Sequence, residues 1–108
     1  MANEQGELWP DWRPSLVKKF QGDIKSVTRQ RGSVYGHPLV NFERISHLKE
    51  GVSGCKDPAI RHALEMICVN LARLVETPDH YDSVLDIAGY GKTILMILDE
   101  RDKLHGTT

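Results

Sequence analysis

Apolar residues recur at helical spacing along two long stretches in the C-terminal half of the chain. The first stretch, residues 57–76, carries them at Ile60, Leu64, Ile67, Leu71 and Leu74. The second, residues 79–103, repeats the spacing at Val84, Ile87, Ala88, Gly91, Ile94, Leu95 and Leu98. Steps of three and four place side chains on one face of an α-helix. We therefore expect two long helices, each buried along its apolar stripe.

The residues between and before these stretches predict where the helices begin and end. Asp57 is suited to cap the first helix, and Pro58 to occupy its first position, because no amide donor is needed there. Thr77 precedes Pro78, and a residue before proline is disfavoured in the α conformation, so the helix ends there. Asp79 or a neighbour then caps the second helix. Such a short link predicts an antiparallel helical hairpin.

Two further helices are expected upstream, near 14–30 and 38–49. Gly32 and Gly36 are expected to break the first, and Gly36-His37-Pro38 to form a turn into the second. The first has an apolar side made of Leu16, Val17, Phe20, Ile24 and Val27, and the second a buried side made of Leu39, Phe42, Ile45 and Leu48. The predicted fold is all-α, a small bundle of about four helices built around the hairpin of 57–76 and 79–103.

The predicted organisation is an N-terminal arm at 1–13, one helical domain at 14–104 and a frayed tail at 105–108. Trp9 and Trp12 in the arm are expected to pack on the chain's own body or on a second subunit, because both rings gain by burial. The helix at 57–76 is apolar nearly all round, so it is either central or covered by another subunit. Gly89 and Gly91 lie inside the last helix, where glycine is costly, which indicates close packing or a ligand. These features predict a homo-oligomer, most simply a dimer.

Composition narrows the class of protein. The 108 residues fit one domain, and 40% of them are hydrophobic, which is far from the composition of a disordered chain. The longest apolar run, at 94–98, is too short for a membrane span, and no signal peptide is recognisable. Cys55 and Cys68 have no metal-binding spacing, so reduced thiols in a cytoplasmic protein are expected.

The net charge of −1 conceals an asymmetry along the chain. Residues 13–49 carry eight basic and two acidic side chains, whereas residues 50–108 carry six basic and ten acidic ones. This division favours an anionic small molecule or a contact between copies, and it is too balanced for a protein that binds duplex DNA.

Candidate ligand-binding residues gather around the Gly36 turn. Guanidinium, aromatic and amide groups are what phosphate pairing, base stacking and base-edge hydrogen bonding require. Such groups occur at Arg31, Tyr35, His37, Asn41 and Arg44, joined by Arg73 and Tyr90 on the two long helices. The alternative is a capped turn with Tyr35 and Phe42 in the core and the arginines in water.

Candidate metal ligands are fewer. Asp82 and Asp86 lie one helical turn apart, with Glu65 as a further carboxylate on the preceding helix. They could hold one weakly bound Mg²⁺, since Mg²⁺ prefers oxygen ligands, or form a solvated acidic face.

Two segments, YGHPLVNFERI at 35–45 and DSVLDIAGY at 82–90, together carry a resemblance. They resemble a phage-encoded family of small helical proteins of unknown function, whose members carry YGxPxxNFxRI followed by DSxxDIAGY. The chain is similar, more loosely, to the nucleotide-modification-associated domains of phages. It is distantly similar to the MazG-like all-α nucleotide pyrophosphohydrolases. The resemblance implies a nucleotide as ligand and a phage-infected cell as the setting.

The MazG-like enzymes bind magnesium with an ExxE pair on one helix and an ExxD pair on the next, and this chain matches that pattern only in part. Asp86 corresponds to the aspartate of ExxD, but Ser83 stands where the glutamate would be. Glu65 is followed three positions later by Cys68. A similar scaffold with an incomplete metal site predicts binding without hydrolysis.

Three functions remain open on this evidence. The first is a phage nucleotide-binding protein without hydrolytic activity, acting in phage nucleotide metabolism or sequestering a nucleotide signal of host defence. In it, Arg31, Tyr35, Asn41 and Arg73 would share a pocket with Asp82 and Asp86. The second is a MazG-like nucleoside triphosphate pyrophosphohydrolase with a reduced metal site. The third is a helical interaction protein that inhibits a host protein.

Overall fold

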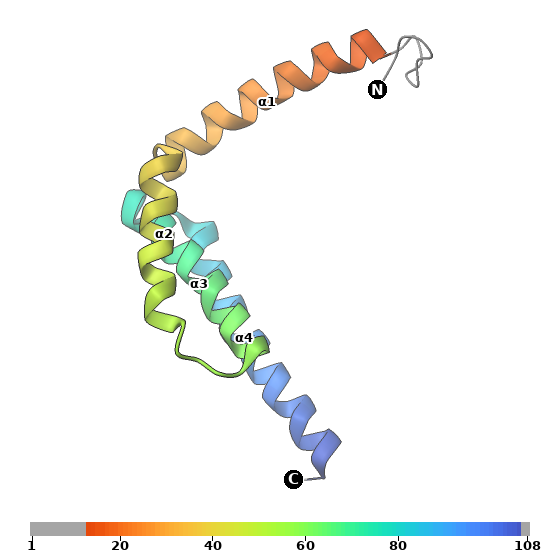
Figure 1. Cartoon of the computed structure of the whole chain (residues 1–108), viewed down its shortest axis with the longest axis vertical. Helices are drawn as coiled ribbons and strands as arrows, with labels where there is room; N and C mark the ends of the chain where they lie inside the picture. The colour runs from red at the N-terminus through yellow and green to blue at the C-terminus, as the bar shows by residue number, and fades with distance from the viewer. Residues whose placement is uncertain (1–12, 107–108) are drawn as a thin grey trace. The chain divides into compact units, whose positions relative to one another are not determined.

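The computed structural model describes residues 13–106, which form four α-helices and contain no β-strand. They are α1 (Arg13–Tyr35), α2 (Pro38–Val52), α3 (Pro58–Glu76) and α4 (Tyr81–His105) (Figure 1). The predicted all-α class is confirmed. Contacts divide the chain into two compact units at the Ser33–Val34 bond. A single domain over 14–104 stays a prediction, and Trp9 and Trp12 lie outside the described residues.

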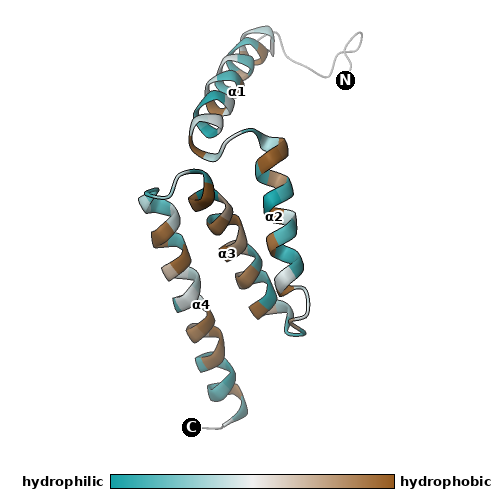
Figure 2. Ribbon diagram, turned by 90° about the vertical axis from the view of Figure 1, so that its left-hand side faces the viewer, coloured by the Kyte–Doolittle hydropathy of each residue, from teal (hydrophilic) through white to brown (hydrophobic). Residues whose placement is uncertain are grey.

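Helices α2, α3 and α4 form one layer with α3 in the middle. Contacts join α2 to α3 and α3 to α4, but within the described residues none joins α2 to α4 (Figure 2). The nearly all-round apolar surface of α3 follows from this position, since a helix with a neighbour on either side buries two faces. The prediction that α3 is central is confirmed for this unit.

Small residues make the helix contacts of this layer. The buried hydrophobic side chains within the described residues are Ala63, Cys68 and Ala72. Three polar residues, Asn41, Asn70 and Ser83, are buried with them. Both cysteines are free thiols, as predicted, and burial raises the pKa of Cys68. None of the described helices has the length and apolar content that crossing a membrane requires.

The stripe by which α4 contacts α3 differs from the predicted one. The more buried positions of α4 are Ser83, Ile87, Tyr90, Ile94 and Ile97. Ile87 and Ile94 were predicted on the buried side. The other predicted members are exposed: Val84, Ala88, Gly91, Leu95 and Leu98. The apolar surface of α4 is broader than one neighbouring helix can cover, and α3 covers only one edge of it. The hairpin thus leaves apolar surface uncovered.

Two other expectations about the upstream helices are wrong. Gly32 does not end α1, which continues to Tyr35, and the chain turns only at Gly36, whose φ is 82°. Leu39 and Phe42 do not lie on the buried side of α2, since Phe42 is 66% exposed. The side facing α3 carries Ile45 and Leu48, as predicted, together with Asn41. In the first turns of α2, Asn41 takes the place on this side that was expected for Leu39 and Phe42.

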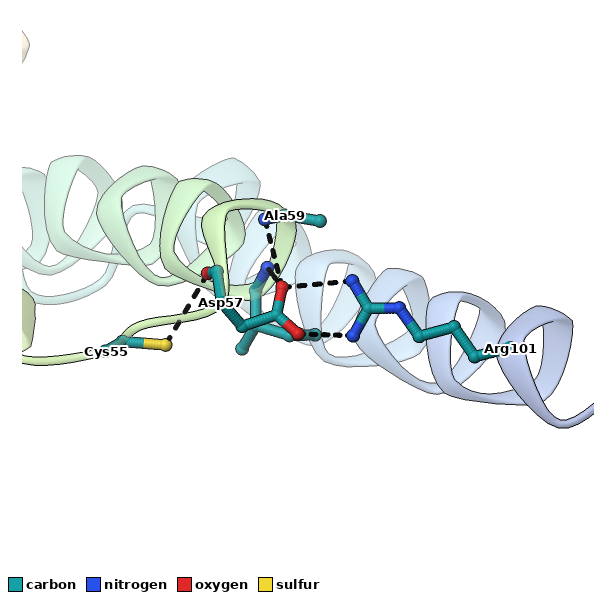
Figure 3. A network of polar contacts seen from close by, with 5 residues as sticks. Cys55, Asp57, Ala59 and Arg101 are labelled. Atoms are coloured by element: carbon teal, nitrogen blue, oxygen red, sulfur yellow. Dashed lines mark hydrogen bonds and ion pairs between the residues drawn. The ribbon is translucent and has the colours of Figure 1, made fainter. Parts of the chain in front are cut away.

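Asp57 links the start of α3 to the far end of α4 (Figure 3). Its carboxylate accepts hydrogen bonds at 3.1 Å from the amides of Ala59 and Ile60, which confirms the predicted cap. The same carboxylate forms an ion pair with both terminal nitrogens of Arg101. These bonds hold the open end of the hairpin together. At the closed end of the hairpin, α4 begins after His80, the residue next to Asp79, and no side chain caps it.

The Asp57 pair predicts a loss of stability in acid. The hydrogen bonds from Arg101, and then that from the amide of Ile60, lower the pKa of Asp57 from 3.8 to about 2. A lowered pKa in the folded state stabilises the protein above pH 3.8, and this contribution is lost as the pH falls to about 2. The melting temperature should therefore drop across this range. Asp57→Asn keeps a capping side chain but loses the ion pair with Arg101. The variant should therefore have a lower melting temperature than the parent at neutral pH, and its melting temperature should fall less in acid.

Thermal melts followed by circular dichroism from pH 5 to pH 2 would measure this. Asp23→Asn is the matched control, because Asp23 forms an exposed pair with Lys19 within α1 and such pairs contribute little. Equal acid profiles for the parent and Asp57→Asn would contradict the role of Asp57.

Candidate functional site

Three segments meet at the closed end of the hairpin: the Gly36 turn, the end of α3 and the start of α4. Each contributes one side chain to a cluster of Tyr35, Arg73 and His80. The guanidinium carbon of Arg73 lies 4.3 Å from the centre of the Tyr35 ring. The His80 ring meets Tyr35 edge-on, with ring centres 6.0 Å apart and an interplanar angle of 82°. We call this cluster the hairpin corner.

A hydrogen bond to the backbone and a close approach of the chain hold the corner in place. The Thr77 hydroxyl donates a hydrogen bond to the carbonyl of Val34, which ties the residue before Tyr35 to the end of α3. A Cβ atom on Gly36 would lie 2.9 Å from the Glu76 carboxyl group. Only glycine combines the positive φ of this turn with so close a neighbour. The turn is therefore built to bring Tyr35 against α3.

Arg73 is the unusual member of the corner. Its Nε is buried and has no hydrogen-bond partner within the described residues. None of the ion pairs found between residues 13 and 106 includes its guanidinium group. Stacking on Tyr35 stabilises the cation through the face of the ring and leaves the edge of the guanidinium group to donate hydrogen bonds. A half-buried cation without an anionic partner is a candidate for binding an anion.

His80 is fixed by a second contact. Its Nδ1 lies 2.7 Å from the hydroxyl of Ser83, which is fully buried. His80 and Ser83 were not among the predicted ligand-binding residues. The sequence feature that could have indicated them is their position shortly after Thr77-Pro78. Residues there lie in or just after the hairpin loop, next to the end of α3.

Other predicted residues have structural partners nearby. Arg44 pairs with Glu76 at 3.5 Å, so its charge is partly neutralised. His37 caps α2, with Nδ1 accepting a hydrogen bond of 3.1 Å from the amide of Leu39. Asn41 is only 6% exposed, and its Oδ1 is buried without a hydrogen-bond partner within the described residues. Of the predicted set, Tyr35 and Arg73 are in direct contact with each other.

The remaining predicted residues lie apart from this contact. Arg31 is exposed on α1, in the first compact unit. Tyr90 is half-buried on the stripe of α4 that faces α3. A shallow hollow on α4 is lined by Tyr90 together with Leu85, Asp86, Ala88, Gly89, Lys92 and Thr93. One helix alone lines it, so it does not enclose a ligand.

The predicted metal ligands remain a pair. Asp82 and Asp86 are exposed one turn apart on α4. No group of three acidic, histidine or cysteine side chains that could hold a metal ion occurs in the part of the chain that the structure describes. Two carboxylates on one helix do not complete a magnesium site, so they would hold Mg²⁺ only together with waters and the phosphates of a ligand.

Comparison with known proteins places the chain in a family. It matches the model of a domain of unknown function, DUF6378, over residues 23–98. It is 37% identical over 86 residues to the Gene 55 protein of Mycobacterium phage D29, a match that covers 80% of this chain and 55% of that protein. It is 38% identical over 68 residues to the Gene 55 protein of Mycobacterium phage L5, a match that covers 59% of this chain and 42% of that protein.

The chain spans about half the length of these curated relatives. No solved structure matches it significantly. Both relatives are phage proteins, which confirms the resemblance to a phage family of unknown function and leaves the MazG-like and nucleotide-modification similarities as predictions. The matched region contains the whole hairpin corner. The chain belongs to the DUF6378 family, whose function is unknown.

Proposed function

We propose that the hairpin corner binds a nucleotide, or an anion derived from one, without hydrolysing it. In a phage-infected cell such binding would serve phage nucleotide metabolism or would sequester a nucleotide signal of host defence. The ligand class was suggested by the resemblance, and the corner supplies groups that suit it.

The observation that carries this proposal is the cation of Arg73, which forms no ion pair with any residue between 13 and 106. A partly buried charge is costly unless an opposite charge or hydrogen bonds compensate for it. Glu76 lies three positions after Arg73 on α3, yet its carboxylate pairs with Arg44. Among the described residues Arg73 thus has no anionic partner, and phosphate matches the geometry of a guanidinium group.

The neighbours of Arg73 suit the rest of a nucleotide. Tyr35 holds the guanidinium plane by stacking, so little side-chain freedom is lost when an anion binds. His80, kept in place by Ser83, is a second hydrogen-bonding group beside the same ring. Base or ribose edges could bond to it.

We propose binding rather than turnover because hydrolysis of phosphoanhydrides in the MazG-like pattern depends on several carboxylates that hold magnesium. In this chain Ser83 replaces one of them and is buried against His80. A buried hydroxyl engaged with an imidazole cannot reach an external metal ion. We therefore assign Ser83 to the support of the corner.

Replacing Arg73 with glutamine should weaken nucleotide binding by roughly tenfold or more. A hydrogen bond to a charged group contributes about 1.5 kcal/mol or more, and each 1.4 kcal/mol changes the affinity tenfold. Titration calorimetry of the parent with a panel of nucleoside mono-, di- and triphosphates would identify the ligand, and the variant would then be measured with it. The ligand should be recovered intact from denatured complexes formed in the presence of Mg²⁺.

Arg61→Gln is the matched control, because Arg61 lies on the same helix and donates to the carbonyl of Cys55 at the opposite end of the hairpin. It should bind like the parent. A parent that retains no nucleotide, or an Arg73→Gln variant with unchanged affinity, would contradict the proposal. Recovery of a monophosphate and pyrophosphate would favour the enzyme instead.

A further inference from the structure

The α3–α4 hairpin presents an apolar face that no residue between Val34 and Gly106 covers. We call it the hairpin face. It consists of Leu71 and Val75 on α3 and Val84, Ala88, Gly91, Leu95 and Leu98 on α4. Leu95 is 65% exposed and Val75 is 59% exposed. Exposed apolar side chains are common singly, but a set that follows two adjacent helices indicates an interaction surface.

Helix geometry places the two stripes on the same side of the hairpin. On α4 each member directly follows a residue that faces α3: Ser83, Ile87, Tyr90, Ile94 and Ile97. On α3 Leu71 directly follows the buried Asn70, and Val75 follows the half-buried Leu74. One step along a helix turns the side chain by about 100°. The two helices are antiparallel, so this rotation is clockwise in one helix and anticlockwise in the other when both are viewed from the same end. The side chains that follow the contact residues therefore point to the same face of the hairpin.

The layer arrangement leaves this face in need of a cover. Domains are built from at least two packed layers, because each element must bury its apolar side. Here α2, α3 and α4 make only one, and their buried hydrophobic residues among those described are small. Two hairpins placed face to face would form a four-helix bundle, a common way to complete such a core.

The pattern on α4 points to a second copy of this chain as the partner. Its stripe is symmetric about Gly91, with Ala88 and Leu95 nearly equidistant on either side and Val84 and Leu98 seven positions away. A two-fold axis passing through Gly91 would set Val84 of one copy opposite Leu98 of the other. Such self-complementarity is what a two-fold interface requires.

Gly91 supplies an independent observation. A Cβ atom at this position would meet no atom of the described residues within 4 Å, so packing among them does not require glycine there. A glycine inside a helix costs about 1 kcal/mol relative to alanine. At a helix crossing it would instead allow two backbones to approach closely. The same residue lies at the centre of the symmetric stripe.

We propose that two copies of this chain pack through their hairpin faces, with α4 crossing α4 of the second copy at Gly91. The stripe from Val84 to Leu98 is about 22 Å long at 1.5 Å per residue, and the face is two helices wide. That extent suits a dimer interface of modest size. The hairpin corner lies outside this face, so the dimer and the nucleotide site can be tested separately.

Sedimentation of the full chain at micromolar concentration should give twice the chain mass of 12.2 kDa. Leu95→Glu should weaken the dimer by at least roughly 100-fold, because it buries charge in the interface of both copies. Met96→Glu is the matched control, since Met96 is 60% exposed, adjacent in sequence and off the stripe. It should sediment like the parent. Circular dichroism would confirm that both variants are helical.

Cysteine substitution tests the crossing itself. Gly91→Cys should form a disulfide between copies under oxidation, because the two-fold axis brings position 91 next to itself. Gly89→Cys is the control, as this glycine has equally open surroundings but lies off the stripe. A monomeric parent, or equal sedimentation of the Leu95→Glu and Met96→Glu variants, would overturn the proposal. A dimer in which Gly91→Cys crosslinks no better than Gly89→Cys would overturn the crossing at Gly91.

Discussion

Replacing Ala72 with leucine is expected to destabilise the unit formed by α2, α3 and α4 by about 3 kcal/mol. Ala72 has no exposed surface, and Glu76, one turn further along the same face of α3, pairs with Arg44 of α2. The methyl group of Ala72 therefore lies where α2 and α3 come close together. A leucine would force the two helices apart or adopt a strained rotamer, and overpacking of this kind costs about 1–3 kcal/mol. Since small domains are stable by only about 5–15 kcal/mol, the effect should be large.

Urea unfolding followed by circular dichroism would measure the change in the free energy of unfolding. Ala59→Leu is the matched control, because Ala59 lies on the same helix and is exposed. The same substitution there should change the free energy by less than about 0.5 kcal/mol. Similar unfolding curves for Ala72→Leu and Ala59→Leu would show that α2 does not pack closely on α3.

Gly36→Ala should destabilise the same unit by about 2 kcal/mol. The residue has a φ of 82°, a conformation that costs a non-glycine residue about 1–2 kcal/mol. The added methyl group would also meet the Glu76 carboxyl group at 2.9 Å. Glu76 can move aside, but the Arg44–Glu76 pair is then lost. If the proposed function holds, nucleotide affinity should fall as well, because the turn positions Tyr35 against Arg73.

Gly106→Ala separates the cost of the positive φ from the cost of the contact with Glu76. Gly106 has a φ of 67°, and no atom of the described residues lies within 4 Å of the added methyl group, so only the backbone conformation is penalised. We expect a loss of about 1 kcal/mol in that variant. Adding Glu76→Ala to Gly36→Ala should remove the close contact with the new methyl group. The double variant should therefore lose less stability relative to Glu76→Ala alone than Gly36→Ala loses relative to the parent. A Gly36→Ala variant as stable as the parent would mean that the turn is not tied to α3 as described.

The hairpin corner could be predicted only in part. Tyr35 and Arg73 were identified from their side-chain chemistry and from the resemblance, and the structure brings them into contact. His80 was missed, because the loop at Thr77-Pro78 shows where the chain turns but not which side chain it presents. Arg44 was chosen for its charge, yet its pairing with Glu76 depends on two residues 32 positions apart. Local sequence does not encode such a pairing.

The helices themselves were determined by the sequence alone. Apolar spacing placed all four, and Asp57-Pro58 and Thr77-Pro78 marked the start and end of α3, because capping and proline geometry act between near neighbours. Tertiary structure alone decided how each helix is rotated about its axis. The apolar surface of α4 is wide enough to contact α3 through either of two adjacent stripes. The α3–α4 contact buries Ser83, Ile87 and Tyr90 and leaves Val84, Ala88 and Gly91 outside, since packing between two helices selects one stripe out of a broad apolar surface.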